Sequence, residues 1–176
     1  MIIVGILGDI GSGKSFISKQ FKCPVFNADD EVNKIYEKSK ICYEKLRNKL
    51  PKYVNYYPIK KIELNKAILA NKNNLKKIVS VVHPLIKKKM NYFLKKNFKR
   101  KLVILDVPLL IENKLNKKKT IMVFVDSKKS QINARLKKRK NYNQAIIENL
   151  RRLQKSLVYK KKLSTYIIKN DFKLLT

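Results

Sequence analysis

The stretch that decides the fold runs Gly8-Asp9-Ile10-Gly11-Ser12-Gly13-Lys14-Ser15 and matches the pattern G-x-x-x-x-G-K-[ST]. Loops of this pattern bind phosphate, because glycine permits positive φ and lets backbone N–H groups approach phosphate oxygens closely. The chain has four glycines, and all lie in or beside this stretch: Gly5, Gly8, Gly11 and Gly13. We therefore expect all eight residues to bind ATP, with Lys14 reaching the β- and γ-phosphates and Ser15 holding Mg²⁺.

The residues on either side of the loop have the pattern that such a loop requires. Residues 2–7 are almost entirely apolar and rich in isoleucine, as in a buried parallel strand. After the loop, Phe16, Ile17 and Phe21 are spaced as on one face of a helix. A strand, the loop and a helix therefore follow one another in the predicted order.

Composition sets limits on the class of protein. A chain of 176 residues is long enough for one domain with a substantial core. The 43 basic and 12 acidic residues give a net charge of +31, which suits anionic partners such as nucleotides, nucleic acid or acidic membrane. The charge is mostly lysine, spread along the chain among many Asn and Ile, so a composition bias of the whole chain is the favoured interpretation. We expect no membrane span and no signal peptide, and hence a cytoplasmic protein.

Asp29 follows a short second strand predicted over residues 23–26. In a parallel sheet, ligands bind beyond the carboxyl ends of the strands, so Asp29 is expected at the functional edge. A carboxylate there could accept a proton from an attacking hydroxyl group or hold Mg²⁺ through water. It could equally cap the following helix, and the local pattern does not separate these roles.

Three further strands are predicted, over residues 102–107, 121–126 and 166–168. The first resembles the second motif of phosphate-loop enzymes, in which four apolar residues precede an acid, here Asp106, that orients Mg²⁺. With the two strands already described, they predict a three-layer α/β/α fold around a parallel five-stranded sheet. Residues of about 40–100 show helical spacing instead, and we interpret them as a helical insert.

Two motifs outside the sheet carry candidate functional side chains. His83-Pro84 lies in the insert, where the proline should break or kink a helix. The histidine could bind a phosphate or ribose, or it could simply cap a helix end. Arg135 and Arg139 share one face of a predicted helix and could form a lid over the phosphates or an ordinary solvated face. A further helix is predicted over residues 142–162, and Asn170 follows the last strand, where a loop could meet an adenine.

In this order, the motifs resemble those of dephospho-coenzyme A kinases over nearly the whole chain. The loop fits the family's G-x-x-G-x-I-G-S-G-K-S, a later segment fits V-P-L-L-[F]-E, and the Arg-bearing helix fits Q-x-x-x-R-L-x-x-R. The matching segments, in family order, are Gly5–Ser15, Ala28-Asp29, His83-Pro84, Val107–Glu112 and Gln131–Arg139. The loop alone indicates only a superfamily; the His-Pro and P-L-L-x-E segments narrow it.

The resemblance implies a reaction in which ATP phosphorylates the ribose 3′-hydroxyl of dephospho-coenzyme A, with Mg²⁺. It implies a single phosphate-loop kinase chain over 1–176, with a core of about 1–39 and 101–176, an acceptor-binding insert of about 40–100 and a lid of about 128–152. ATP and dephospho-coenzyme A would be its partners, with no membrane and no specific nucleic acid. The oligomeric state stays open, a monomer being favoured.

Roles for individual residues follow from the same resemblance. Asp29, Lys14 and Arg135 would be catalytic, and Ser15 with Asp106 would hold the metal. Arg139 and Asn170 would bind ATP together with the loop. The acceptor would be bound by Asp29, His83, Pro108 and Leu109.

The chain departs from the family pattern at several positions. Asn27 stands where an Asp is usual, Asp9 replaces a common Gly of the loop, and Leu150 occupies a position where many members have Arg. Arg151 or Arg152 could substitute for that arginine. These changes bear on catalytic rate more than on family.

Two other functions are compatible with parts of the sequence. Another small phosphate-loop kinase, acting on a nucleoside monophosphate or a metabolite, would share Lys14 and the lid arginines but would not need His83-Pro84. A nucleic-acid-binding protein would use the basic charge, and its affinity would fall steeply with salt. The sequence contains no helix-turn-helix, zinc or RNA-binding signature.

Overall fold

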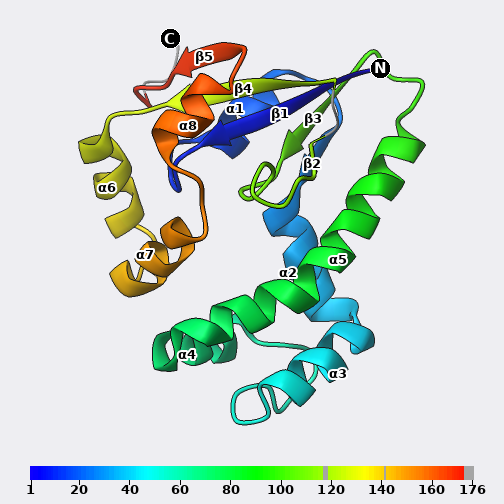
Figure 1. Ribbon diagram of the computed structural model, residues 1–176, viewed down its shortest axis with the longest axis vertical. Coiled ribbons are helices and arrows are strands. Elements are labelled where there is room, and N and C mark those ends of the chain that lie inside the picture. Colours follow the sequence, from blue (N-terminus) through cyan, green and yellow to red (C-terminus); the bar gives the residue numbers. More distant parts are fainter. Residues whose placement is uncertain (117–118, 141, 173–176) are drawn as a thin grey trace. The chain divides into compact units, whose positions relative to one another are not determined.

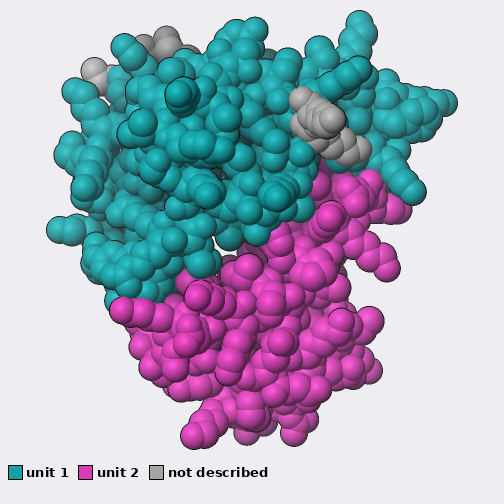
Figure 2. Space-filling model, in the orientation of Figure 1, with its two compact units in different colours: residues 1–27, 94–176 teal, residues 28–93 magenta. Residues whose placement is uncertain are grey.

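The computed structural model describes residues 1–116, 119–140 and 142–172. Parts of the predicted core (117, 118, 173–176) and lid (141) lie outside the described residues. The chain forms two compact units, one of residues 1–27 and 94–176 and one of residues 28–93 (Figure 2). The helical unit begins at Ala28, earlier than the boundary expected near residue 40. The reason is that Ile35 and Tyr36 are buried, and the backbone oxygen of Tyr36 accepts a 3.0 Å hydrogen bond from Ile59 N.

The first unit is built on a five-stranded parallel sheet in the order β2-β3-β1-β4-β5 (Figure 1). The prediction of such a sheet is therefore confirmed. The central strand β1 is buried along almost its whole length, which explains its continuous apolar sequence. The strands are β1 (Ile2–Gly8), β2 (Val25–Asn27), β3 (Leu102–Asp106), β4 (Thr120–Asp126) and β5 (Tyr166–Lys169).

Helices cover both faces of this sheet, as Figure 1 shows for α1 (Lys14–Gln20) and α8 (Leu157–Lys162). Ile17 of α1 packs against the cluster that contains Val4 and Ile6 of β1. Successive strand residues point to opposite faces, so Gly5 belongs to the other side. A Cβ atom at Gly5 would lie 2.5 Å from Leu110 Cδ2. Glycine at this position therefore lets the segment after β3 pack directly on the strand.

Two shorter helices, α6 (Lys129–Lys137) and α7 (Gln144–Arg152), precede α8. The single helix predicted over residues 142–162 is wrong, because α7 ends at Arg152 and α8 begins at Leu157. Side-chain caps explain the break. The Ser156 hydroxyl accepts a hydrogen bond from Tyr159 N, as the Asn143 side chain does from Ile146 N at the start of α7.

The second unit consists of α2 (Ala28–Lys38), α3 (Lys40–Lys49), α4 (Lys61–Ala70) and most of α5 (Lys72–Lys96). Pro84 lies inside α5, so of the predicted break or kink, the break is wrong: the helix continues past the proline. Buried residues on both sides of it, Val82 and Ile86, hold the two halves of the helix in one core. Even α5 carries many lysines, and no helix in the described part of the chain is long and apolar enough to cross a membrane.

A buried ion pair joins the segment after β3 to α8. Lys160 Nζ lies 3.0 Å from Glu112 Oε1, and the two side chains are only 1% and 8% exposed. Lys160 also donates to Gln154 Oε1 at 2.7 Å, and the backbone N–H of Lys155 donates to the Glu112 carboxylate at 2.8 Å. Burying two charges is costly, and these hydrogen bonds offset part of that cost.

Replacing Lys160 with Met should lower the free energy of unfolding by about 3 kcal/mol, because the Glu112 carboxylate would stay buried without its cation. The double variant Glu112→Gln, Lys160→Met should lose less, since no charge is then left buried. Urea unfolding followed by circular dichroism measures both. Lys162→Met, at an exposed position of the same helix, is the control and should change stability by less than about 0.5 kcal/mol. Equal losses for the two lysine variants would contradict the assigned role of the pair.

Candidate active site

The phosphate loop joins β1 to α1 and takes a conformation that depends on glycine. Gly8, Gly11 and Gly13 have φ angles of 148°, 86° and 90°, and Gly13 forms the left-handed cap of α1. Residues other than glycine rarely adopt such φ angles, so the loop could not take this conformation with other residues at these positions. The curl leaves backbone N–H groups available to surround an anion.

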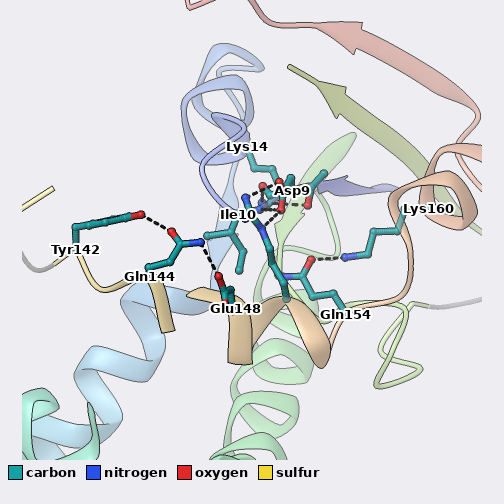
Figure 3. Close-up of polar contacts among 10 residues, drawn as sticks. Asp9, Ile10, Lys14, Tyr142, Gln144, Glu148, Gln154 and Lys160 are labelled. Carbon is teal, nitrogen blue, oxygen red and sulfur yellow. Dashed lines mark hydrogen bonds and ion pairs between the residues drawn. The ribbon is translucent and has the colours of Figure 1, made fainter. Parts of the chain in front are cut away.

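Lys14 folds back across this loop. Its Nζ donates to the backbone oxygen of Asp9 at 2.7 Å and to that of Gly8 at 3.3 Å (Figure 3). The ammonium group is therefore held at the loop itself, where it can donate to phosphate oxygens of a nucleotide.

Ser15 and Asp106 come together at the carboxyl edge of the sheet. Ser15 Oγ donates to Asp106 Oδ2 at 2.5 Å, although 91 residues separate them in the chain. Asp106 ends β3 and is only 3% exposed. A hydroxyl and a carboxylate are oxygen ligands of the type that Mg²⁺ prefers, and Mg²⁺ in nucleotide sites uses one or two protein groups plus phosphate oxygens and water. The described residues contain no group of three or more His, Cys, Asp or Glu side chains that could hold a metal ion. The pair thus fits a metal that the nucleotide helps to hold.

Asn27, which stands where the family usually has Asp, joins the same cluster through hydrogen bonds. Its Nδ2 donates to Asp106 Oδ2 at 2.9 Å and to Ser15 Oγ at 3.3 Å. The parallel register sets Asn27 of β2 beside Asp106 of β3, so the amide orients the carboxylate. The departure from the family's Asp thus exchanges a second carboxylate for a hydrogen-bond donor.

Asp9 is engaged by an arginine from α7. Arg151 Nε and Nη2 donate to Asp9 Oδ1 and Oδ2 at 3.1 and 2.9 Å, a two-pronged contact between residues 142 positions apart. The backbone N–H of Ile10 also donates to Oδ1, at 2.7 Å. In the sequence, Asp9 stands out only as a replacement for a common Gly, and Arg151 only as one of two possible substitutes for the arginine that Leu150 replaces. Only the fold reveals that the two form a pair.

The expected adenine side of the loop is formed by the segment after β5. Asn170 Nδ2 donates to Ser12 O at 2.9 Å, and Asn170 Oδ1 accepts from Phe172 N at 3.1 Å. The Phe172 ring lies 4.2 Å from the guanidinium carbon of Arg135, a cation–π distance. Arg135 therefore contacts an aromatic ring that the sequence did not single out, while Arg139 lies exposed just beyond the end of α6.

The predicted acceptor residues are divided between the two units. Pro108 and Leu109 are half-buried and follow β3 after one intervening residue, Val107. Asp29 lies in the first turn of α2 with two other acids and is exposed. That helix begins at Ala28, so Asp29 is not its cap residue and the capping alternative is wrong.

His83 is half-buried in the middle of α5, so the alternative that it caps a helix end is also wrong. Its Nε2 is buried and has no hydrogen-bond partner among the residues that the structure describes. Burial lowers the pKa of His83, and the nearby Lys87 ammonium lowers it further, so the ring is neutral at neutral pH. A neutral imidazole with an unused buried nitrogen can accept or donate one hydrogen bond to a ligand.

A glycine-shaped loop at the centre of a parallel sheet, with a lysine folded over it and a Ser–Asp pair at its edge, defines the phosphate-loop nucleotide-binding class. The comparisons with known proteins narrow this class. The family model of dephospho-CoA kinase matches residues 2–175, and the chain belongs to that family.

Individual relatives agree with this assignment. The dephospho-CoA kinase of Wolbachia pipientis wMel is 32% identical over 172 residues, which span 95% of this chain and 88% of the relative. A Thermus thermophilus protein of known crystal structure is 25% identical, with a TM-score of 0.75 over 96% of this chain and 88% of its own. The dephospho-CoA kinase of Campylobacter jejuni has the same fold, with 20% identity and a TM-score of 0.62 over 97% and 89% of the two chains.

Proposed function

We propose that the protein transfers the γ-phosphoryl group of ATP to the ribose 3′-hydroxyl of dephospho-coenzyme A, giving coenzyme A and ADP. The observation that carries the proposal is the Ser15–Asp106 pair beside the phosphate loop, in a chain whose family is dephospho-CoA kinase. A phosphate loop that no longer bound nucleotide would not need Lys14, the Ser15 hydroxyl and the Asp106 carboxylate together.

The loop and Lys14 bind the triphosphate in this proposal. Gly8 to Ser15 surround the phosphates with backbone N–H groups, and Lys14 exchanges its contacts with the loop oxygens for phosphate oxygens. The transition state of phosphoryl transfer is loose, so positioning and charge neutralisation contribute more than the strength of a base. The loop supplies both.

Ser15 and Asp106 would hold Mg²⁺, directly or through water, and Asn27 would keep the Asp106 carboxylate oriented. Mg²⁺, when bound, neutralises charge that develops on the β- and γ-phosphates. The Asp106 carboxylate is only 3% exposed, and the hydrogen bonds from Ser15 and Asn27 restrain its rotation.

Arg135, Arg139 and Asn170 would complete the ATP site from the side of the lid. The Arg135 guanidinium, now stacked on Phe172, can turn toward the phosphates when the lid closes, and Arg139 lies two residues beyond the end of α6, on the segment that leads to α7. Asn170 is anchored to Ser12 of the loop, which favours a role beside the nucleotide base.

Asp29, His83, Pro108 and Leu109 would bind the acceptor. Asp29 would orient the 3′-hydroxyl and accept its proton, as a positioned carboxylate can. The unused Nε2 of His83 would bond the acceptor, while Pro108 and Leu109 would contribute half-buried apolar surface.

ADP release with Mg-ATP tests the proposal directly. Release should require dephospho-coenzyme A, with coenzyme A as product, and Lys14→Ala should abolish it, because charge on the transferred group is then not neutralised. Nucleoside monophosphates and a reaction without acceptor run in parallel. Release with a monophosphate instead would keep the fold and reject the acceptor.

Asp29→Asn should reduce kcat about 10²- to 10³-fold while the KM for ATP stays within about threefold, since an amide cannot accept the proton. Steady-state kinetics with dephospho-coenzyme A measures the change. Asp30→Asn makes the same substitution at the next exposed residue of the same helical turn and should keep kcat within about twofold. Full activity of Asp29→Asn would reject the catalytic role.

His83→Ala should raise the KM for dephospho-coenzyme A about tenfold or more, with the KM for ATP little changed, because one hydrogen bond to the acceptor is lost. His83→Gln keeps a polar nitrogen near the same position and should lose less. Since the pKa of His83 lies below its ordinary value, the ring stays neutral above about pH 7, and titration of His83 should leave the acceptor KM unchanged from about pH 7 to pH 8.5. An effect confined to ATP would reject this role.

A further inference from the structure

Asp9 places a negative charge inside the loop that has to bind the negatively charged phosphates. The residue is only 8% exposed, and its own backbone oxygen accepts the hydrogen bond from Lys14 Nζ. Charges in such surroundings are weakly screened by water. Without a partner, the Asp9 carboxylate would therefore repel ATP from close range.

Arg151 removes this difficulty. Two nitrogens of its guanidinium meet the two Asp9 oxygens in parallel, which is the strongest geometry for an Arg–carboxylate pair. The side chains of Arg151 and Asp9 are 26% and 11% exposed, so the pair is largely withdrawn from solvent. The Ile10 N–H fixes the same carboxylate from the side of the loop.

The pair also connects α7 to the loop. Ile10 packs against the apolar cluster of Ile132, Leu136 and Ile147, which belongs to α6 and α7. Ile10 of the loop thus holds α6 and α7 by apolar contact, and Asp9, the residue before it, holds α7 by an ion pair. A cavity of about 320 Å³ lies beside the pair, lined among others by Asp9, Ser12, Asp126, Ile132, Arg151 and Gln154. Asp9 and Arg151 therefore form part of the wall of a pocket beside the phosphate loop.

We propose that Asp9 and Arg151 are a positioning pair: the arginine cancels the charge that Asp9 brings into the phosphate loop and fastens the end of α7 to it, which lowers the KM for Mg-ATP. The alternative is that Arg151 itself binds the phosphates of ATP, and that Asp9 only pairs with it while ATP is absent. The two differ in what happens when both charges are removed together. The inference rests on the proposed function only in taking ATP as the nucleotide.

A double-mutant cycle separates these possibilities. Arg151→Met removes the cation and leaves the carboxylate, whereas Asp9→Asn removes the charge but keeps an oxygen that can accept from Ile10 N. Arg151→Met should raise the KM for Mg-ATP about tenfold with kcat within about threefold, because the bare carboxylate repels the phosphates. Asp9→Asn should stay within about threefold of the wild-type KM, and the double variant Asp9→Asn, Arg151→Met should return to that range.

If the double variant has as high a KM for Mg-ATP as Arg151→Met, the arginine acts directly on ATP. If the KM of Arg151→Met is unchanged, the pair has no effect on ATP binding. Either result overturns the proposal. Salt adds a readout that a purely structural role would not move: between about 0.05 and 0.5 M KCl, the KM difference between Arg151→Met and wild type should shrink. Arg152→Met, at the exposed neighbouring position, is the matched control and should leave the KM unchanged.

Two further measurements separate the effect of charge from that of geometry and test ATP binding without the acceptor. Arg151→Lys retains the positive charge without the two-pronged contact and should lie between wild type and Arg151→Met. Calorimetric binding of a non-hydrolysable Mg-ATP analogue should follow the same order as the KM values. Because this binding needs no acceptor, it still tests the pair if dephospho-coenzyme A proves not to be the substrate. Equal affinity of all the variants for the analogue would reject the proposal by itself.

Discussion

The structure depends on one backbone constraint: the chain has to reverse direction tightly at the end of β1 while presenting N–H groups to an anion. Gly8, Gly11 and Gly13 meet this constraint with positive φ angles. The sheet order then brings β3 and β4 to the two sides of β1, so Asp106 and Ser127 end beside the same loop. Ser127 Oγ donates to Ser12 O at 3.0 Å, and Asp106 accepts from Ser15. The site therefore follows from the loop conformation together with the parallel strand order.

Features that are local in the chain could be predicted from the sequence. The loop, β1 and the apolar runs of β3 and β4 each depend on residues that are adjacent or regularly spaced. The Asp9–Arg151 and Arg135–Phe172 contacts could not be predicted, because their members are 142 and about 37 positions apart. In a chain with 43 basic residues, no pattern marks which arginine will meet which partner.

The predicted break at Pro84 and the predicted single helix over residues 142–162 are both wrong, because each rested on a single local preference. Proline removes one hydrogen bond and disfavours a helix, yet α5 runs through Pro84 because its core residues are buried on both sides. The apolar spacing over residues 142–162 suggested one helix, but Ser156 caps a new one and turns the chain toward β1. Burial, which requires knowledge of the neighbours, decided the first case. The Ser156 cap is a local feature, but the apolar spacing outweighed it in the prediction.

The net charge of +31 gives the few acids a particular place in this fold. In the described part of the chain, four acids form ion pairs between different elements. Asp9 joins the loop to α7, and Glu112 joins the segment after β3 to α8. Asp126 joins β4 to α8, and Glu31 joins α2 to α5. Because cations are in large excess, an acid placed between two elements meets a cationic side chain more readily than a given lysine meets an acid. The position of the acids therefore decides which elements are joined. By this argument, acidic residues such as Asp9 specify the architecture of the site more than the far more numerous lysines do.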